Sequence, residues 1–446
     1  MEDVSPVMTC VSGPDTGRQF AIKGGATTLG TGAGCHVESA DPVLTGMQVT
    51  FTLADGRVTF EATDADVVEV DGVAQTIGAV RPGQQVRIGT SIWQLADEDA
   101  ARQFAGFLGR VGGHIGAAAG LGRVEGFSVR EMFSEVFKRH PDEEVDAYFS
   151  IGSPATTPSL ADLGTAWPRP WVFARAATLS VLLYLGFSLA IGKWDNPKLV
   201  PGMMFAGTFA IPCSVLLFFF EVNVPRNISL YQVIKMMLLG AILSLCLAMV
   251  GFGLTRPAGH WLGEMIAGPV EETAKFLPLL LVINKLKYRW TLNGLLMGAT
   301  VGCGFAAFES AGYAFYYGIL VERSIEAMRD NIEMRGALTL CGGHIAWTAL
   351  VGAAIWKVRG QGRFRWSMVL DPRFLRIFAI SVAMHMIWNS RIPSDYYLKY
   401  LVLGFIAWTL VIAFIHDGLK QVRTAQAALE AEGEGEGTTD PPQADG

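Results

Sequence analysis

Long apolar runs between residues 171 and 418 constrain this chain more than any other feature. A helix of about 20 predominantly apolar residues crosses the hydrocarbon core of a bilayer. Eight segments of roughly that length follow one another: 171–192, 199–220, 230–254, 261–283, 291–318, 338–356, 374–391 and 398–416. Charged residues make up 17% of the chain, whereas soluble proteins carry about 25%. We therefore predict an all-α, polytopic membrane bundle of about eight transmembrane helices over residues 171–418.

The residues on either side of the bundle are polar and predict further parts. Residues 6–96 alternate polar and apolar residues in short stretches, and Asp55-Gly56 is a strong hairpin signal. This pattern predicts an all-β sandwich over residues 1–98. Residues 99–170 are expected to be a linker and juxtamembrane segment, and residues 419–446 a disordered acidic tail. The fold class is therefore multi-domain, with a β-sandwich followed by a helical membrane bundle.

The charges in the loops predict the orientation of the bundle. Cytoplasmic loops are enriched in Lys and Arg. Such residues gather at 285–289 and 357–376, while the loop at 319–337 is balanced. MEDVSPVMTC lacks the features of a secretory signal. We therefore expect a multi-pass protein of the cell (inner) membrane with both termini in the cytoplasm.

Two further classes of site are disfavoured by the composition. The net charge of −6 gives no indication of nucleic-acid binding. The six cysteines form no CxxC pair, so neither a zinc framework nor a disulfide framework is expected.

The N-terminal strands resemble a forkhead-associated (FHA) domain, a reader of phosphothreonine peptides. The resemblance runs through TTLGTGAGCHV, DPVLTGMQVTFTLADGRVTFE and VDGVAQTIGAVRPGQQVRIGTSIWQL, about 90 residues. The recognition positions of the family are changed here to Thr31, Thr45, Gln48 and Asp66. A phosphate site without its Arg and Ser loses its charge-assisted donors. The resemblance thus implies a degenerate FHA-like head that binds a protein partner, with no phosphopeptide binding expected.

Polar residues interrupt four of the predicted spans. They are Glu271-Glu272-x-x-Lys275, Phe305-x-x-x-Glu309, His344 and His385-x-x-x-Asn389. Each charge at bilayer depth costs roughly 2.5 kcal/mol or more. At 1.5 Å per residue, the glutamates lie roughly 14 Å, and the histidines roughly 9 Å, below the outer ends of their helices. The similar depths predict one polar, water-accessible cavity in the outer half of the bundle.

Glutamates and histidines around a trapped water are the groups that hydrolysis requires. Two adjacent carboxylates can also serve as a base and an acid. A non-catalytic membrane scaffold and an ion-coupled transporter, each with a docking head, remain alternatives from other classes. Neither explains why these groups should meet at one depth, and the chain has no internal repeat of the kind many transporters show.

The four motifs, in this order, resemble the PrsW family of intramembrane proteases, which belongs with the CAAX prenyl proteases and Abi proteins in one superfamily. The family pattern EExxK/R, FxxxE, His and HxxxN/D falls on residues 271–275, 305–309, 344 and 385–389 without a departure. The resemblance covers about residues 165–418 and implies hydrolysis of peptide bonds within or beside the membrane. By family analogy the substrate is a membrane protein such as an anti-sigma factor.

The expected roles follow from this resemblance and from the chemistry. Glu271 is the expected general base, with Glu272 as its partner and Lys275 as charge balance. Glu309, His344 and His385 are expected to position water, or a divalent metal such as zinc, and to stabilise the oxyanion. Asn389 would orient His385 or donate to the oxyanion. Both a metal-dependent and a metal-free glutamate scheme stay open, because no HExxH motif fixes a zinc.

Overall fold

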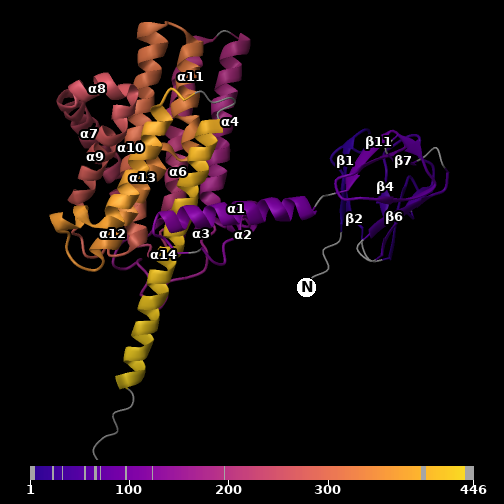
Figure 1. Ribbon diagram of the computed structural model, residues 1–446, viewed down its shortest axis with the longest axis horizontal. Helices are drawn as coiled ribbons and strands as arrows, with labels where there is room; N and C mark the ends of the chain where they lie inside the picture. The colour runs from indigo at the N-terminus through magenta and orange to yellow at the C-terminus, as the bar shows by residue number, and fades with distance from the viewer. Residues whose placement is uncertain are drawn as a thin grey trace, which may run out of the picture. The chain divides into compact units, whose positions relative to one another are not determined.

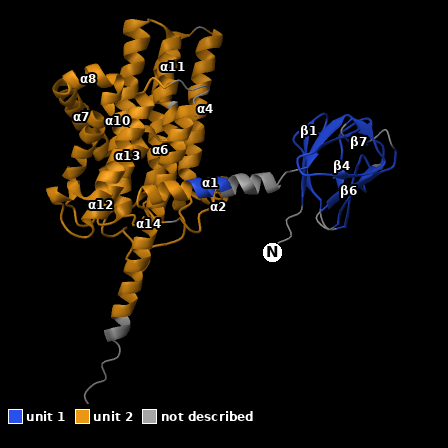
Figure 2. Cartoon of the chain, viewed as in Figure 1, with its two compact units in different colours: residues 1–111 blue, residues 112–446 orange. Residues whose placement is uncertain are grey.

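The computed structural model describes residues 6–22, 25–32, 34–54, 57–64, 68–70, 72–95, 98–122, 124–194, 196–392 and 398–436. The chain divides into unit 1, Met1–Val111, and unit 2, Gly112–Gly446 (Figure 2). Unit 1 holds the strands, and unit 2 holds the helical bundle (Figure 1). The predicted fold class, an all-β part followed by a helical membrane part, is confirmed.

Unit 1 is a sandwich of two sheets. One sheet has the strand order β2-β1-β11-β10-β7-β8, and the other has the order β4-β3-β5-β6-β9. The strands are β1 (Val7–Ser12), β2 (Gln19–Ala21), β3 (Gly25–Gly30), β4 (Val37–Glu38), β5 (Met47–Ala54), β6 (Arg57–Ala62), β7 (Val68–Val70), β8 (Val73–Ala74), β9 (Ile77–Val80), β10 (Gln85–Ile88) and β11 (Ser91–Leu95). Every second residue of β6 is buried, as a sheet with one face on a core requires.

The predicted hairpin is present, since β5 and β6 pair antiparallel with Ala54 opposite Arg57. Its turn residues, Asp55 and Gly56, lie outside the described residues. Asp66, one of the four changed FHA positions, also lies outside them.

A buried carboxylate makes the stability of this sandwich depend on pH. Asp41 is fully buried and accepts hydrogen bonds from Val43 N at 3.1 Å, Thr90 N at 2.7 Å and Ser91 Oγ at 3.1 Å. Burial acts to raise the pKa of Asp41, but these hydrogen bonds outweigh it and hold the pKa below its ordinary value of 3.8. The stabilisation is therefore present above about pH 4 and is lost as the pH falls towards the folded-state value.

We expect protection of the β10 and β11 amides from hydrogen exchange, corrected for intrinsic rates, to fall between pH 5 and pH 3. Asp41→Asn should protect these amides less at pH 5 and should flatten the dependence on pH. An equal dependence in both proteins would show that another group titrates.

The helix α1 (Glu98–Ala118) starts in unit 1 and ends in unit 2. The other helical elements all belong to unit 2. They are α2 (Val129–Met132), α3 (Asp142–Phe149), α4 (Trp171–Trp194), η1 (Pro197–Leu199), α5 (Val200–Phe205), η2 (Ala206–Ala210), α6 (Ile211–Glu221), α7 (Leu230–Leu254), α8 (Arg256–Leu262), η3 (Gly263–Ile266), α9 (Ala267–Phe276), η4 (Leu277–Leu281), α10 (Thr291–Phe315), η5 (Tyr316–Val321), α11 (Ile325–Arg335), η6 (Ala337–Cys341), α12 (Gly343–Arg359), η7 (Trp366–Leu370), α13 (Pro372–Asn389) and α14 (Leu398–Glu436). Of these, η2 and η5 are π-helical and the other η elements are 3₁₀.

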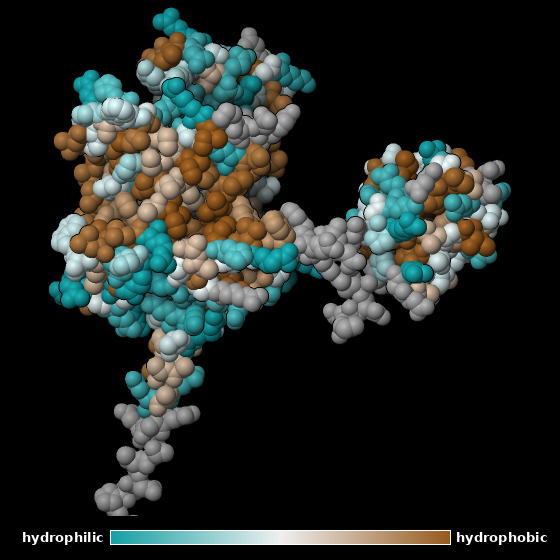
Figure 3. All heavy atoms as spheres, viewed as in Figure 1, coloured by the Kyte–Doolittle hydropathy of each residue, from teal (hydrophilic) through white to brown (hydrophobic). Residues whose placement is uncertain are grey.

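Unit 2 has the surface of a membrane protein. Hydrophobic residues form a broad band between two polar ends on the face shown in Figure 3. Six helical stretches of the described chain are long and apolar enough to span a bilayer: 171–194, 197–221, 230–254, 291–321, 325–359 and 398–432. On α4, Leu182 and Leu189 are 60% and 72% exposed, as side chains facing lipid would be.

Two of the eight predicted spans differ in the structure. The segment 261–283 is not one long helix, because Gly263 leaves the helical region with φ 56° and Pro278 opens the 3₁₀ turn η4. The short α9 lies between these breaks. The segment 374–391 forms α13 but is not among the six candidate spans.

The predicted linker and tail are also more ordered than expected. Met132 and Ile151, from the segment expected to be a linker, join the same hydrophobic cluster as Phe219 and Leu295 of the bundle. Residues 128–170 therefore include a cap packed on one end of the bundle. The tail expected from residue 419 begins later, because α14 continues as helix to Glu436.

Glycines let α10 and α12 pack in close contact at the centre of unit 2. Gly294, Gly298 and Gly302 recur every fourth residue along α10. A Cβ on Gly298 would lie 2.2 Å from the carbonyl oxygen of Thr348, and one on Gly302 would lie 2.4 Å from that of His344. Such small-xxx-small stripes allow helix backbones to approach closely in membranes. This contact holds His344 against the middle of α10.

Gly298→Ala should therefore separate α10 from α12 and destabilise the protein by about 1–3 kcal/mol. Thermal unfolding in detergent measures this change. The matched control is Gly312→Ala on the same helix, where a Cβ meets nothing within 4 Å. Equal unfolding temperatures for the two variants would contradict the close-packing argument.

Candidate active site

The predicted polar residues come from four helices that pack on one another. α9 carries Glu271, Glu272 and Lys275, α10 carries Glu309, α12 carries His344, and α13 carries His385 and Asn389. Glu271, Glu272, Lys275 and His385 are buried. Hydrogen bonds and ion pairs connect six of these seven residues, and Asn389 lies beside them.

Lys275 is the charge at the centre of the site. It is fully buried, and its Nζ donates to Glu272 Oε1 at 2.6 Å. The same ammonium lies 2.8 Å from Nδ1 of His344 and 4.7 Å from the ring centre of Phe305. A buried ion pair is tolerated when further hydrogen bonds satisfy it. The lysine thus neutralises Glu272 and joins α9 to α12.

The two histidines are held in different ways. Nδ1 of His385 lies 2.9 Å from Glu272 Oε1, so this nitrogen carries the proton that the carboxylate accepts. Its Nε2 then has a free lone pair. An ammonium only donates, so Nδ1 of His344 accepts from Lys275, and its Nε2 carries the ring proton and lies 3.0 Å from Glu309 Oε2. The partners of each ring therefore set its tautomer.

Glycine places His344 at the start of its helix. Gly342 and Gly343 have φ of 120° and 49°, and Gly342 precedes α12 directly. Residues with side chains rarely adopt such angles. The two glycines turn the chain so that His344, the second residue of α12, faces α9 and α10.

The sequence did not predict two further contacts. Arg335, at the end of α11, lies 3.1 Å from Glu309 Oε2 and 3.5 Å from the ring centre of Tyr313. Trp347 stacks on His385 with ring centres 4.8 Å apart. Trp347 follows His344 by three residues on one helix face, a spacing that could have indicated it. No spacing indicates Arg335, because η6 and the glycine turn separate it from α12.

Like Glu272 and Glu309, Glu271 has one carboxylate oxygen that makes no hydrogen bond within the described part of the chain. Oε2 is buried and has no hydrogen-bond partner among the described residues. It lies 3.6 Å from Nε2 of His385, which is too long for a direct hydrogen bond. Both atoms are acceptors when Nδ1 of His385 carries the ring proton. A protic molecule between them would satisfy both.

A small cavity with space for water lies next to His344 and Trp347. Arg335, His344, Trp347, Trp388 and Asn389 line a cavity with about 20 Å³ open to the centre of a water molecule. About 10–15 Å³ is enough to hold one water. Asn389 donates only a long hydrogen bond, 3.5 Å, to the Glu264 carbonyl. Its amide therefore faces the cavity beside His344, and the described residues include no hydrogen bond from it to His385.

The site also offers a possible ligand set for a metal. Glu271, His344 and His385 each present one ligand atom, all within 4.8 Å of one another. Glu309, which the sequence prediction included in this set, lies outside it and contacts His344 instead. One carboxylate and two imidazoles suit zinc, and the unpartnered Glu271 Oε2 fits such a role. His344 would have to release Glu309 or Lys275 to take part.

Comparison with known proteins gives a match for each unit. Residues 229–416 match the PrsW family intramembrane metalloprotease. That range contains all seven predicted site residues. Comparison with curated proteins found no match.

Among solved structures, the N-terminal part of the chain is similar to FHA domains. An FHA domain from Chlamydia trachomatis is 16% identical, with TM-score 0.20, and the match covers 21% of this chain and 97% of that one. An FHA domain of Mycobacterium tuberculosis is 17% identical, with TM-score 0.18 and coverage of 21% and 98%. The FhaA FHA domain, solved with the intracellular domain of a second protein, is 14% identical, with TM-score 0.19 and coverage of 20% and 99%.

The membrane unit of this chain is thus similar, over residues 229–416, to the PrsW family of intramembrane metalloproteases.

Proposed function

We propose that unit 2 is an endopeptidase that hydrolyses a membrane-associated protein with a water molecule activated by Glu271. The observation that carries this proposal is the pair of facing acceptors, Glu271 Oε2 and His385 Nε2, 3.6 Å apart in a buried site. A water molecule can donate one hydrogen to each of them. Its lone pair then points away from both, towards a substrate carbonyl.

The three candidate ligand atoms could also hold a metal, since all lie within 4.8 Å of one another and Glu271 Oε2 lies 3.6 Å from His385 Nε2. Zinc ligands lie about 2.0–2.2 Å from the ion and would have to move together. When bound by Glu271, His344 and His385, a divalent ion such as zinc would polarise the carbonyl and acidify its water.

The chemistry of the chain's own residues can be followed proton by proton. Glu271 accepts a proton as the water oxygen bonds to the carbonyl carbon. The negative charge that develops on the carbonyl oxygen accepts a hydrogen bond from Asn389 Nδ2, which lines the small cavity. Glu271 then returns its proton to the leaving amine as the C–N bond breaks. The complete cycle returns every side chain of the site to its starting protonation state.

The remaining charged groups act as positioning residues. Glu272 fixes the His385 ring through Nδ1, and Lys275 balances the charge of Glu272. Glu309 holds His344 and Arg335 at 3.0 Å and 3.1 Å. Such outer contacts fix the tautomer and orientation of the groups that react.

A membrane-substrate panel, incubated with the purified full-length protein in vesicles with and without chelator, tests this function. We expect site-specific cleavage that a chelator leaves within about twofold if water is activated by Glu271 alone, and a loss of about 10²-fold or more if a metal is needed. Restoration by added Zn²⁺ would identify the metal scheme. Absence of any cleavage across the panel, with folded protein, would count against the protease assignment.

The head is proposed to bind a protein partner without recognising phosphate. Thr31, at the position of the family's arginine, accepts from Gly46 N and donates to the Leu44 carbonyl, so its hydroxyl is used within the fold. Thr45 accepts from Gln48 Nε2 at 2.9 Å. We also propose cytoplasmic termini and a membrane protein substrate such as an anti-sigma factor.

We expect the head, within the full chain, to bind a phosphothreonine-peptide library no better than the unphosphorylated library. Fluorescence anisotropy measures this, and micromolar binding that depends on phosphate would overturn the expectation.

A further inference from the structure

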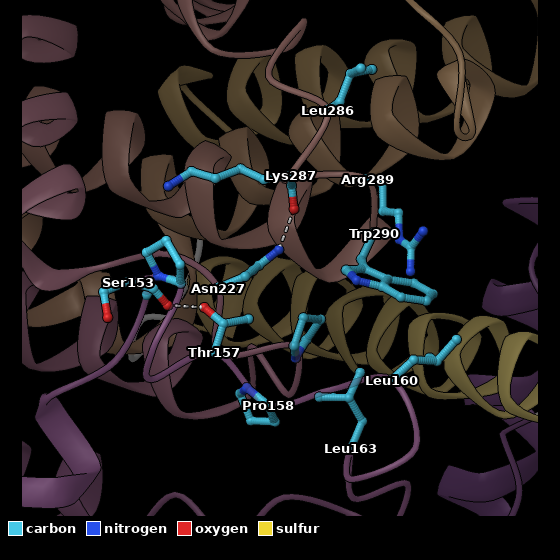
Figure 4. Close-up of a pocket in the computed structure, with 13 residues that line it drawn as sticks. Ser153, Thr157, Pro158, Leu160, Leu163, Asn227, Leu286, Lys287, Arg289 and Trp290 are labelled. Carbon is cyan, nitrogen blue, oxygen red and sulfur yellow. Dashed lines mark hydrogen bonds between the residues drawn. The ribbon is translucent and has the colours of Figure 1, made fainter.

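A large cavity of unit 2 shares no lining residue with the small cavity beside His344. It measures about 480 Å³ and is lined by residues from three stretches, 152–163, 225–227 and 286–290 (Figure 4). Cavities of roughly 300–1,000 Å³ hold small molecules in proteins. Its lining mixes leucine, proline and tryptophan with two cationic side chains. The cavity therefore has the size and the mixed character of a ligand site.

Polar contacts fix the walls of this cavity. Asn227 is buried, donates to the Lys287 carbonyl (Figure 4), and exchanges hydrogen bonds with Asn293 of α10. Tyr288, between the two cations, has its carbonyl oxygen bound by Trp356 Nε1 at 2.7 Å. The backbone that presents the cations is therefore held by buried side chains.

The stretch 152–163, which also lines the cavity, is held against the bundle by a close contact at Gly152. Gly152 has φ 88°, and a Cβ there would lie 2.2 Å from the Ser229 nitrogen. Thr157 Oγ1 donates to the Ser153 carbonyl at 2.7 Å, which closes the following turn. Only glycine permits this approach to the start of α7. The stretch from 152 to 157 thus stays against the bundle.

The charges of the cavity lack a counter-ion. Lys287 and Arg289 line it, and its lining contains no Asp or Glu. Among the described residues, no ion pair within 4.0 Å is found for either cation. Instead, Lys287 Nζ lies 4.8 Å from the ring centre of Tyr288, and Arg289 Cζ lies 4.7 Å from that of Trp290. The pKa of nearby Lys285 is lowered by partial burial and by the charges of Lys235 and Lys287. The local potential is therefore positive and favours an anion.

The position of the cavity indicates where the anion comes from. Residues 225–227 lie between the spans 197–221 and 230–254, and residues 286–290 directly precede the span 291–321. The cavity is therefore at the level where a membrane's headgroups meet water. Clusters of Lys and Arg with Trp or Tyr at this level are typical of lipid contacts. Leu160, Leu163 and Leu286 offer an apolar surface beside the cations.

We propose that this cavity binds the phosphate-bearing headgroup of an anionic phospholipid, with Lys287 and Arg289 as the groups that recognise the phosphate. The guanidinium of Arg289 can donate two hydrogen bonds to phosphate oxygens, and Lys287 adds a point charge. Trp290 and the leucines contact the glycerol and the start of the acyl chains. This site is independent of the proteolytic site and would make the stability of the bundle depend on the lipid around it.

Binding of short-chain lipids to the purified full-length protein in detergent tests the proposal. The probes are dihexanoyl phosphatidylglycerol, dihexanoyl phosphatidylcholine and inorganic phosphate, and native mass spectrometry gives their dissociation constants. We expect phosphatidylglycerol to bind at least about tenfold more tightly than phosphatidylcholine, because only the former has a net negative headgroup. Inorganic phosphate that binds as tightly as phosphatidylglycerol would overturn the assignment to a lipid.

The variant Lys287→Gln/Arg289→Gln should weaken phosphatidylglycerol binding at least about tenfold. The matched control is Arg363→Gln/Arg365→Gln, which removes the same charge from two exposed residues of another loop. We expect this control to bind within about twofold of the unchanged protein. If the double variant does not fold, the single variant Lys287→Gln, at an exposed position, is measured in its place and should also weaken phosphatidylglycerol binding. Equal binding by the Lys287/Arg289 variant and the control would overturn the proposal.

Discussion

Glu271→Gln should abolish peptide hydrolysis while the protein remains folded. The amide keeps the shape of the side chain but can no longer take a proton from water. A positioned general base contributes about 10²–10⁴-fold to a rate, so we expect initial rates to fall by at least about 10²-fold. Rates of product formation from a single cleaved membrane substrate measure the loss.

Glu264→Gln is the matched control, since Glu264 is an exposed residue of η3 whose backbone carbonyl, not its carboxylate, contacts Asn389. It should cleave within about twofold of the unchanged protein, as surface substitutions usually have small effects. Similar losses in both variants would mean that charge near α9 matters in general. Full activity of Glu271→Gln would remove Glu271 from the mechanism.

Lys275→Met should strongly destabilise the bundle. Lys275 is fully buried, and its loss leaves the Glu272 carboxylate, which is 1% exposed, without its ion-pair partner. Breaking a buried ion pair from one side costs about 3–5 kcal/mol. Met fills much of the same volume as Lys, so the loss of stability comes more from the missing charge than from poorer packing. A lower midpoint of thermal unfolding in detergent is the expected result.

A second substitution separates charge from packing in this prediction. Lys275→Met with Glu272→Gln removes both charges, and it should recover part of the lost stability, because no uncompensated ion remains. Neither the single nor the double variant should hydrolyse substrate well, since His385 loses the carboxylate or the charge balance that fixes it. A double variant less stable than Lys275→Met alone would contradict the ion-pair account.

Most of the site was predictable from the sequence because its chemistry sits on helix faces. Residues four apart share a face, so the spacing alone pairs Phe305 with Glu309 and His385 with Asn389. A buried charge also needs a partner, which indicated Lys275 beside the glutamates. Arg335 could not be predicted in this way. Its contact with Glu309 depends on how α11 returns through η6 and the Gly342 turn, which no local periodicity specifies.

The same reasoning explains which parts of the fold were predicted. Apolar runs and alternating strands depend on local composition and spacing, and both units have the expected class. The break of 261–283 into α8, η3, α9 and η4 was not predicted, because hydropathy does not register a positive φ at Gly263. The cap over residues 128–170 depends on long-range contacts, such as Tyr148 with Glu221 at 3.2 Å, that cross the sequence.

Incorporation of oxygen from H₂¹⁸O tests the central claim most directly. The purified full-length protein, in vesicles with the cleaved membrane substrate, is incubated in H₂¹⁸O, and the new C-terminus is examined by mass spectrometry. Direct attack by water on the peptide carbonyl, with Glu271 as the base, predicts one ¹⁸O atom at that terminus, formed by the unchanged protein and by Glu264→Gln but not by Glu271→Gln. The same labelled product from Glu271→Gln at an undiminished rate would contradict the account.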